Sequence, residues 1–262
     1  MRMTYELVVI GGGNMGAALL GGMLASSVAS ELAVVEPVAG RRDQLTEMFP
    51  TVAVLDRIPS CRSAVIAVKP PDVAAVAEEA AAAGAVRLLS VAAGVTTAAV
   101  SAAAGRDVAV VRTMPNTPAL VGEGVSAIAG GAGAGEDDLA WAERILSGVG
   151  LVVRVSESQL DAVTGLTGSG PAYLFLVAEA LMDAGVAVGL ARPVAERMVA
   201  QLLVGSAKLL AERGDPAGLR AMVTSPGGTT AAGVSVLEDR AVRAALIGAV
   251  RAATERSREL GA

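Results

Sequence analysis

Solid apolar runs alternate with longer amphipathic stretches along the first 155 residues of the chain. Strand-like runs, apolar except for a few polar residues in 31–36 and 86–91, lie at residues 7–10, 31–36, 52–55, 64–68, 86–91 and 108–111. A continuous apolar run is typical of a parallel strand that is buried on both faces. Helices are expected between these strands, at residues 14–26, 72–83 and 96–104. The alternation predicts an α/β fold with a doubly wound parallel sheet.

The pattern changes near residue 155. The last strands are expected at 125–129 and 151–155, with a helix over 136–147 between them. Beyond that point only helical periodicity remains, over 157–213 (broken at 168–171 and near 189), 216–224 and 229–260. We therefore expect one domain over residues 1–155 and an all-helical second domain over residues 156–262. The Ala, Leu and Val faces of these helices exceed what a small bundle can bury, which indicates oligomerisation.

Composition narrows the class of protein. The chain of 262 residues is 53% hydrophobic and 2% aromatic, and its net charge is −5. This charge argues against a nucleic-acid or anionic-membrane partner, which would need a basic face. The apolar runs are interrupted before they reach the length of a membrane span, and the N-terminus does not resemble a signal peptide. We expect a soluble, cytoplasmic protein.

Histidine is absent from the chain, and Cys61 is its one cysteine. The first absence removes histidine-based acid–base catalysis, Ser-His-Asp triads and most zinc sites. Cys61 directly precedes an apolar strand, which favours a buried structural thiol over a nucleophile. No metal site is expected.

A glycine-rich turn follows the first strand. It consists of Gly11, Gly12, Gly13, Asn14, Met15 and Gly16. Gly11 permits the tight turn, Gly13 lets the backbone approach a pyrophosphate, and Gly16 lets the next helix pack on the sheet. The helix that opens at Asn14 and Met15 offers N–H groups and a favourable dipole to phosphates. The first domain is therefore predicted to be a Rossmann-type domain that binds a nicotinamide dinucleotide.

The end of the second strand leaves the choice between NADH and NADPH open. Glu36 lies twenty residues beyond Gly16, where an acidic residue accepts hydrogen bonds from the adenosine ribose and repels a 2′-phosphate. Arg41 and Arg42 follow closely, and arginines can neutralise a 2′-phosphate. An exposed helix face is an equally good interpretation of the arginine pair.

Three further strand ends should meet at the same edge of the sheet, because the crevice at the carboxyl ends of parallel strands is where ligands bind. The residues at these ends that are expected to contact the cofactor or the substrate are Val68, Lys69, Pro70, Ala93, Gly94 and Asn116. Each alone also fits a structural turn. Together they favour a binding site.

The second domain carries two segments with chemical character. Residues 224–230 read Thr-Ser-Pro-Gly-Gly-Thr-Thr and residues 161–173 read Asp-Ala-Val-Thr-Gly-Leu-Thr-Gly-Ser-Gly-Pro-Ala-Tyr. A glycine turn before a helix start presents N–H groups and hydroxyls, which can receive a carboxylate without a cationic side chain. An ordinary Ser/Thr cap is the structural alternative. Glu157, four residues before Asp161, could face a cation or simply complement a helix dipole.

These segments, together with the glycine turn, Ala67–Pro70 and Met114–Pro118, closely resemble pyrroline-5-carboxylate reductase in the same order over essentially the whole chain. The resemblance implies reduction of L-1-pyrroline-5-carboxylate to L-proline by hydride transfer to C5 of the protonated imine. It implies that Thr230 lies beside the imine nitrogen as the catalytic hydroxyl and that Glu157 lies near the substrate. The residues implied to hold the substrate carboxylate are Ser225, Gly227, Gly228, Thr229 and Thr230.

The resemblance also implies that the helical domain is a substrate-binding and dimerisation domain, in a homodimer that can assemble into a larger ring. Two residues depart from the pattern of many members, Met222 and Glu36, and both bear on the choice of NADPH or NADH.

Two other functions compete with this interpretation. A β-hydroxyacid dehydrogenase shares the two-domain plan but uses a helix lysine, and the surroundings of Lys208 do not resemble that motif. A cofactor-sensing regulatory protein would bind the dinucleotide without consuming it.

Overall fold

The computed structural model describes residues 4–261 of the chain. The chain forms two compact units. The first contains the residues up to Ser169 and the C-terminal segment from Arg251, and the second runs from Gly170 to Val250. The last strand ends at Arg154. Residues 155–169 follow it and still belong to the unit that contains the sheet, not to the helical unit. The boundary near residue 155 stays a prediction.

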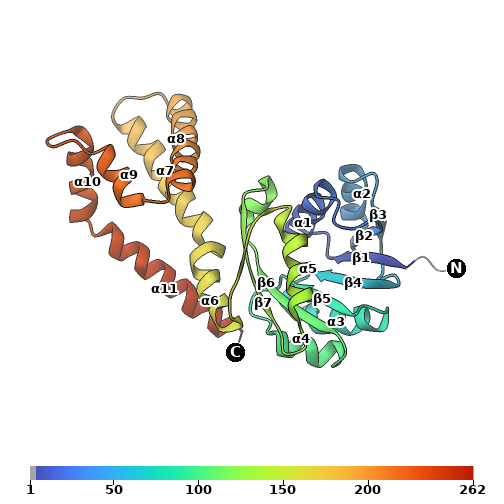
Figure 1. Cartoon of the computed structure of the whole chain (residues 1–262). Coiled ribbons are helices and arrows are strands. Elements are labelled where there is room, and N and C mark those ends of the chain that lie inside the picture. The colour runs from blue at the N-terminus through green and yellow to red at the C-terminus, as the bar shows by residue number, and fades with distance from the viewer. Residues whose placement is uncertain (1–3, 262) are drawn as a thin grey trace. The chain divides into compact units, whose positions relative to one another are not determined.

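The first unit is built on one eight-stranded sheet with the order β3-β2-β1-β4-β5-β6-β7-β8 (Figure 1). The strands are β1 (Tyr5–Ile10), β2 (Leu32–Val35), β3 (Ala53–Leu55), β4 (Cys61–Ile66), β5 (Arg87–Ser90), β6 (Ala109–Met114), β7 (Gly124–Gly130) and β8 (Gly150–Arg154). The pairs among β1–β6 are parallel, and so is the pair β7–β8. The predicted doubly wound sheet is confirmed for these strands.

One pair of neighbouring strands is antiparallel. β7 pairs antiparallel with β6, with Thr113 opposite Ile128. The connection between them holds only the short 3-10 turn η2 (Thr117–Val121). A parallel pair needs a long crossover, whereas antiparallel neighbours can be joined by a short segment. The sequence analysis predicted this strand without a direction, and the short connection explains its antiparallel pairing.

Helices cover both faces of the sheet. They are α1 (Asn14–Ala25), α2 (Ala39–Met48), α3 (Val73–Ala82), α4 (Thr97–Ala104) and α5 (Glu136–Ser147). Leu7 and Val9 of β1 join one core with α1, α2 and α5, while Val8 and Ile10 join a second core with α3 and α4. Successive residues of a strand point to opposite faces, so an apolar strand needs cover on both sides. This explains the continuous apolar runs.

Five short elements complete the first unit. They are η1 (Pro70–Asp72), η2, η3 (Glu157–Gln159), α6 (Leu160–Val163) and the π-helical turn η4 (Thr164–Gly168). A π turn breaks the regular helical hydrogen-bond pattern and occurs frequently at functional sites. This turn ends at Gly168, the first residue of the segment 168–171 at which a helix break was expected.

The regular elements of the second unit, Gly170–Val250, are all helices. Its helices are α7 (Gly170–Ala187), α8 (Arg192–Arg213), α9 (Pro216–Met222), α10 (Thr229–Asp239) and α11 (Val242–Leu260), of which α11 continues into the first unit. The expectation of one helix over 229–260 is wrong, because the chain turns between α10 and α11 at Ala241, where φ is +54°. Tyr173 joins α7 to α11 through a hydrogen bond of 3.5 Å from its hydroxyl to the carbonyl oxygen of Ala249.

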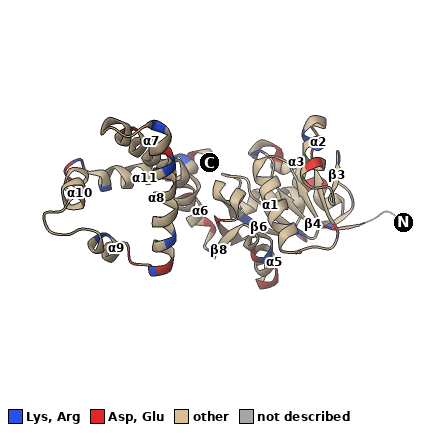
Figure 2. Ribbon diagram, turned by 90° about the horizontal axis from the view of Figure 1, so that it is seen from above, with Lys and Arg blue, Asp and Glu red and all other residues tan. Residues whose placement is uncertain are grey.

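Large apolar side chains of the second unit stay exposed in the single chain. On α7, Leu174, Phe175 and Leu176 are 60–66% exposed. Charged residues are sparse along this helix (Figure 2). By length and composition alone the segment Glu157–Ala187 would also suffice to cross a membrane, and only 6% of its apolar window is buried. These faces call for a covering partner.

Candidate functional site

Three glycines of the turn after β1, Gly11, Gly13 and Gly16, differ in what surrounds them. Gly11 has φ +106°, and a Cβ there would collide with the carbonyl group of Ala67. A Cβ on Gly16 would collide with the carbonyl oxygen of Gly11. A Cβ on Gly13 would meet nothing within 4 Å, and Gly13 is exposed. Gly11 and Gly16 therefore serve close packing, whereas Gly13 borders open space that a ligand can fill.

Helix α1 begins at this open space. Its cap residue is Gly13, which has no side chain to accept from the first N–H groups, and no acidic residue lies in the first turn. The helix start therefore carries positive partial charge without a built-in counterion. Asn14 is exposed and Met15 half-buried beside it. These residues fit the pyrophosphate of a dinucleotide.

Glu36 braces the glycine turn from the end of β2. Its carboxylate accepts hydrogen bonds from the backbone N–H of Gly12 at 3.0 Å and of Val38 at 2.9 Å. Arg41 donates from Nε to the carbonyl oxygen of Gly12 at 2.7 Å. A carboxylate has further lone pairs, so Glu36 can still accept from a ribose hydroxyl. Sequence alone did not indicate this bracing role.

Arg42 is directed to the backbone instead of to open space. It donates to the carbonyl oxygens of Glu36 and Pro37, at 3.0 and 2.8 Å. Arg41 is thus the guanidinium that adjoins the glycine turn. The choice between NADH and NADPH stays open, since a buried carboxylate and a half-buried guanidinium lie side by side at the turn.

The other strand ends reach the same edge, because β1, β2, β4, β5 and β6 run parallel. Lys69 and Pro70 after β4 are exposed, and Val68 is half-buried against Gly11. Ala93 after β5 is exposed. Gly94 has φ +77°, and a Cβ there would lie 3.1 Å from the carbonyl oxygen of Leu260. Gly94 thus lets the end of α11 approach this edge.

Asn116, after β6, is committed to the protein. It is 8% exposed; its side-chain amide donates to the carbonyl oxygen of Thr167 at 3.1 Å and accepts from the N–H of Val125 at 2.8 Å. Thr167 belongs to the π turn, whose irregular backbone leaves carbonyl groups that need partners. Asn116 therefore ties β6 and β7 to that turn.

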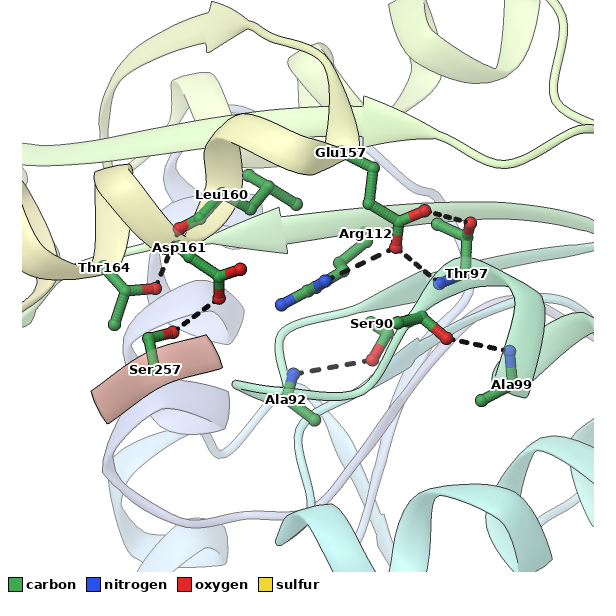
Figure 3. Close-up of polar contacts among 11 residues, drawn as sticks. Ser90, Ala92, Thr97, Ala99, Arg112, Glu157, Leu160, Asp161, Thr164 and Ser257 are labelled. Carbon is green, nitrogen blue, oxygen red and sulfur yellow. Dashed lines mark hydrogen bonds and ion pairs between the residues drawn. The ribbon is translucent and has the colours of Figure 1, made fainter. Parts of the chain in front are cut away.

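A polar cluster surrounds Glu157, at the start of η3 (Figure 3). One carboxylate oxygen accepts from the N–H of Thr97 and the other from its hydroxyl, both at 2.6 Å. The guanidinium of Arg112, which is 6% exposed, lies 3.4 Å from the first oxygen. Thr97 opens α4, so Glu157 also places a negative charge at the amino terminus of that helix.

These contacts set the charge state of Glu157. Burial raises the pKa of its carboxyl, but hydrogen bonds from Thr97 and the charge of Arg112 outweigh that effect and hold the pKa below its ordinary value. Beside it, Asp161 accepts a hydrogen bond of 2.7 Å from the Ser257 hydroxyl on α11 (Figure 3). Both acids thus join the segment after the sheet to other elements of the first unit.

The segment 224–230 forms the expected turn and helix start in the second unit. Gly227 has φ +69°, a conformation that L side chains rarely adopt, and the N–H of Gly228 donates to the carbonyl oxygen of Ser225 at 3.0 Å. Helix α10 then begins at Thr229, and its cap Gly228 supplies no side-chain acceptor. The N–H groups of the first turn and the hydroxyl of half-buried Thr230 have the chemistry that an anion requires.

Cys61 is buried at the start of β4, and burial raises the pKa of its thiol to about 11. This fits a structural thiol. Among residues 4–261, no group of three or more His, Cys, Asp or Glu side chains could hold a metal ion.

Known proteins match this two-part arrangement. A family model described as "NADP oxidoreductase coenzyme F420-dependent" matches residues 6–94, and one described as "Pyrroline-5-carboxylate reductase dimerisation" matches residues 157–260. A pyrroline-5-carboxylate reductase of Synechocystis is 43% identical, with 99% of each chain covered. The chain belongs to the pyrroline-5-carboxylate reductase family. The resemblance inferred from the sequence is confirmed.

Solved structures of the pyrroline-5-carboxylate reductase family have the same fold. The enzyme of Coxiella burnetii superposes with a TM-score of 0.91 at 34% identity and covers 99% of this chain and 100% of its own. The pyrroline carboxylate reductase of Plasmodium falciparum, solved with NADP bound, has a TM-score of 0.84 at 27% identity and covers 100% of both chains. The predicted Rossmann-type domain followed by a helical dimerisation domain is confirmed.

Three side chains of the site were not predicted: Thr97, Arg112 and Ser257. Each contacts an acid that lies far along the chain, at sequence separations of 45 to 96 residues. The only available signal was a charged residue inside an apolar strand, Arg112, since a buried charge requires a partner.

Proposed function

We propose that this chain reduces L-1-pyrroline-5-carboxylate to L-proline, the last step of proline biosynthesis, with NADPH or NADH as the electron donor. The observation that carries the proposal is full-length membership of the pyrroline-5-carboxylate reductase family together with an open glycine turn and an uncapped helix start. When bound, the nicotinamide supplies the hydride that forms the new C–H bond at C5.

The cofactor is proposed to bind at the carboxyl edge of the sheet. Gly13, Asn14 and Met15 bind the pyrophosphate, while Gly11 and Gly16 shape the turn. Glu36 and Arg41 contact the adenosine ribose. The remaining cofactor-contacting residues are proposed to be Val68, Lys69, Pro70, Ala93, Gly94 and Asn116. The contacts of Gly94 and Asn116 within the protein indicate that they act mainly by shaping this edge.

The substrate carboxylate is proposed to bind at the amino terminus of α10, where Ser225, Gly227, Gly228 and Thr229 present backbone N–H groups and hydroxyls. The hydroxyl of Thr230 is proposed to stabilise or relay the proton on the imine nitrogen. Because the substrate imine can be protonated in solution, a hydroxyl suffices and a strong general acid is not needed. Glu157 is proposed to contribute negative charge that favours the cationic iminium.

The match to the family's dimerisation domain supports a homo-oligomer, and membership of the reductase family supports a small-molecule substrate. We propose a homodimer whose second copy covers the exposed apolar faces of α7–α11, with a larger ring as a further assembly, and a cytoplasmic location.

The test of the reaction is consumption of NADPH and NADH with pyrroline-5-carboxylate, beside a panel of 2- and 3-hydroxy and keto acids. The proposal predicts proline formation in step with cofactor oxidation. Turnover confined to the hydroxy or keto acids would instead indicate a β-hydroxyacid dehydrogenase, and binding without turnover a cofactor sensor.

Thr230→Val and Thr230→Ser test the catalytic hydroxyl. Valine keeps the branched shape, so cofactor affinity should be unchanged while kcat/KM falls about 10- to 1000-fold. Serine retains the hydroxyl and should restore most of the activity. Equal kcat/KM in Thr230→Val and the unmodified enzyme would show that the Thr230 hydroxyl has no role in the reaction.

A further inference from the structure

A small basic cavity lies at the amino-terminal edge of the sheet, within the first unit. Its volume is about 240 Å³. Three arginines line it: Arg62 at the start of β4, Arg87 at the start of β5 and Arg144 in the last turn of α5. Ser63 and Trp141 also line it. The chain as a whole has a net charge of −5, so three arginines that line one cavity make this region unusually basic.

The carboxylates near this cavity do not cancel all three arginines. Asp138 pairs with Arg87 at 2.9 Å. Glu6, which also lines the cavity, accepts from the N–H and hydroxyl of Ser30 at 3.0 and 3.1 Å. Within residues 4–261, no carboxylate pairs with the guanidinium of Arg62 or Arg144.

The cavity also has a rigid wall. Trp141 is 7% exposed, and the guanidinium carbon of Arg87 lies 6.0 Å from the centre of its ring. The ion pair with Asp138 and this cation–π contact hold Arg87 in one orientation. Ser63, 5% exposed, contributes a hydroxyl from the next strand.

We propose that this cavity is a binding site for a small dianion, held through its phosphate or carboxylate oxygens by Arg62, Arg87 and Arg144. Guanidinium groups offer planar pairs of N–H donors that match such oxygens. The chemistry fits an inorganic or organic phosphate and a dicarboxylate equally, so the two are separated by experiment.

The site is separate from the proposed cofactor edge. Glu6 lies near the amino end of β1 and Gly11 directly after its carboxyl end. Five residues of strand at roughly 3.3 Å each place the two edges about 16 Å apart. Binding of the dianion therefore does not depend on the proposed reaction.

Trp141 is the one tryptophan of the chain and serves as a local reporter. Its emission is recorded, with excitation that avoids tyrosine, while the full-length protein is titrated with inorganic phosphate or with succinate. Sodium chloride keeps the ionic strength constant, since surface charge effects respond to salt. The proposal predicts a saturable change with at least one dianion and none with chloride alone. The more tightly bound probe identifies the ligand class.

Variants locate the binding. Arg62→Gln combined with Arg144→Gln should raise the Kd at least tenfold, while Arg106→Gln, an exposed arginine elsewhere in the first unit, should leave it unchanged. Arg144→Gln alone, at an exposed helix position, should raise the Kd about threefold. This single variant replaces the double variant in the test if circular dichroism shows that the double variant is unfolded. The titration is repeated with saturating NADP⁺, which occupies the glycine turn.

Three results would overturn the proposal. They are no saturable change with either dianion, an unchanged Kd in the folded arginine variants, or loss of the signal when NADP⁺ is bound. Failure of the proposed reaction would leave all three measurements unaffected, because none uses turnover.

Discussion

Replacing Glu157 by glutamine removes the negative charge from the polar cluster that Glu157 forms with Thr97 and Arg112 and keeps the size of the side chain. Two hydrogen bonds of 2.6 Å to Thr97 become neutral, and charge-assisted bonds are roughly twice as strong as neutral ones. Each bond therefore loses about 1 kcal/mol. Arg112, with 8% of its side chain exposed, also loses its counter-charge 3.4 Å away. Partial exposure of Glu157 limits that loss to about 1 kcal/mol. Together these losses lower the free energy of unfolding of Glu157→Gln by about 2 to 3 kcal/mol.

The free energy of unfolding is measured by urea denaturation at one fixed protein concentration, because oligomerisation couples stability to concentration. Glu47→Gln, at an exposed position of α2, is the matched control. The pH dependence gives a second readout. The folded-state pKa of Glu157 is lowered, so its stabilisation is fully present above the unfolded pKa and is lost as pH falls through the folded pKa. The difference in unfolding free energy between the unmodified protein and Glu157→Gln should be constant from about pH 6 to 8, should narrow below the ordinary glutamate pKa of about 4.3, and should close once the pH lies below the lowered folded-state pKa.

The kinetics of Glu157→Gln separate bracing from substrate contact. If the carboxylate faces the iminium, kcat/KM falls at a temperature at which the variant is fully folded. If it only joins η3 to α4, kcat/KM per folded enzyme is unchanged. A loss of unfolding free energy below about 0.5 kcal/mol relative to Glu47→Gln would refute the structural argument, since neutral surface changes stay within that range.

Two further predictions concern packing. Gly13→Ala adds a methyl group to open space and should leave the unfolding free energy within about 1 kcal/mol while raising the Kd for NADPH at least tenfold; Gly16→Ala collides with Gly11 and should lower Tm as well. Equal effects of the two changes on Tm would contradict this division, and calorimetry with a cofactor titration measures both. Among the described residues, the buried hydroxyl of Thr113 has no hydrogen-bond partner, so Thr113→Val should raise the unfolding free energy by about 1 kcal/mol. A destabilised Thr113→Val would show that the hydroxyl is satisfied.

Periodicity predicted most of the elements because strands buried on both faces and helices with one buried face leave local traces. The predicted helix over 136–147 coincides with α5, and the strands of the first domain differ from the observed ones by a few residues at their ends. The direction of β7 left no such trace, because it depends on the length of the connection after β6 and not on the strand itself. The break at Ala241 was missed because alanine is a strong helix former with no turn signal of its own.

The candidate site was predictable where backbone chemistry defines it. Gly11 follows from a backbone conformation that favours glycine, whereas Gly13 and Gly16 follow from the close approach of a ligand and of the packed helix. The hydrogen-bond partners of Glu157 and Asn116 were not predictable, because they lie on elements far along the chain that only folding brings together. For both side chains the sequence left a ligand contact and a structural role open, and the structure shows that each makes hydrogen bonds within the protein.

The most direct test of the proposed reaction follows the hydride itself. The enzyme is incubated with pyrroline-5-carboxylate and NADPH that carries deuterium at the transferred position of the nicotinamide, and the proline formed is analysed by mass spectrometry and NMR. The proposal predicts one deuterium per proline, located at C5. Proline without deuterium, deuterium at another carbon, or oxidation of the cofactor without proline would contradict it.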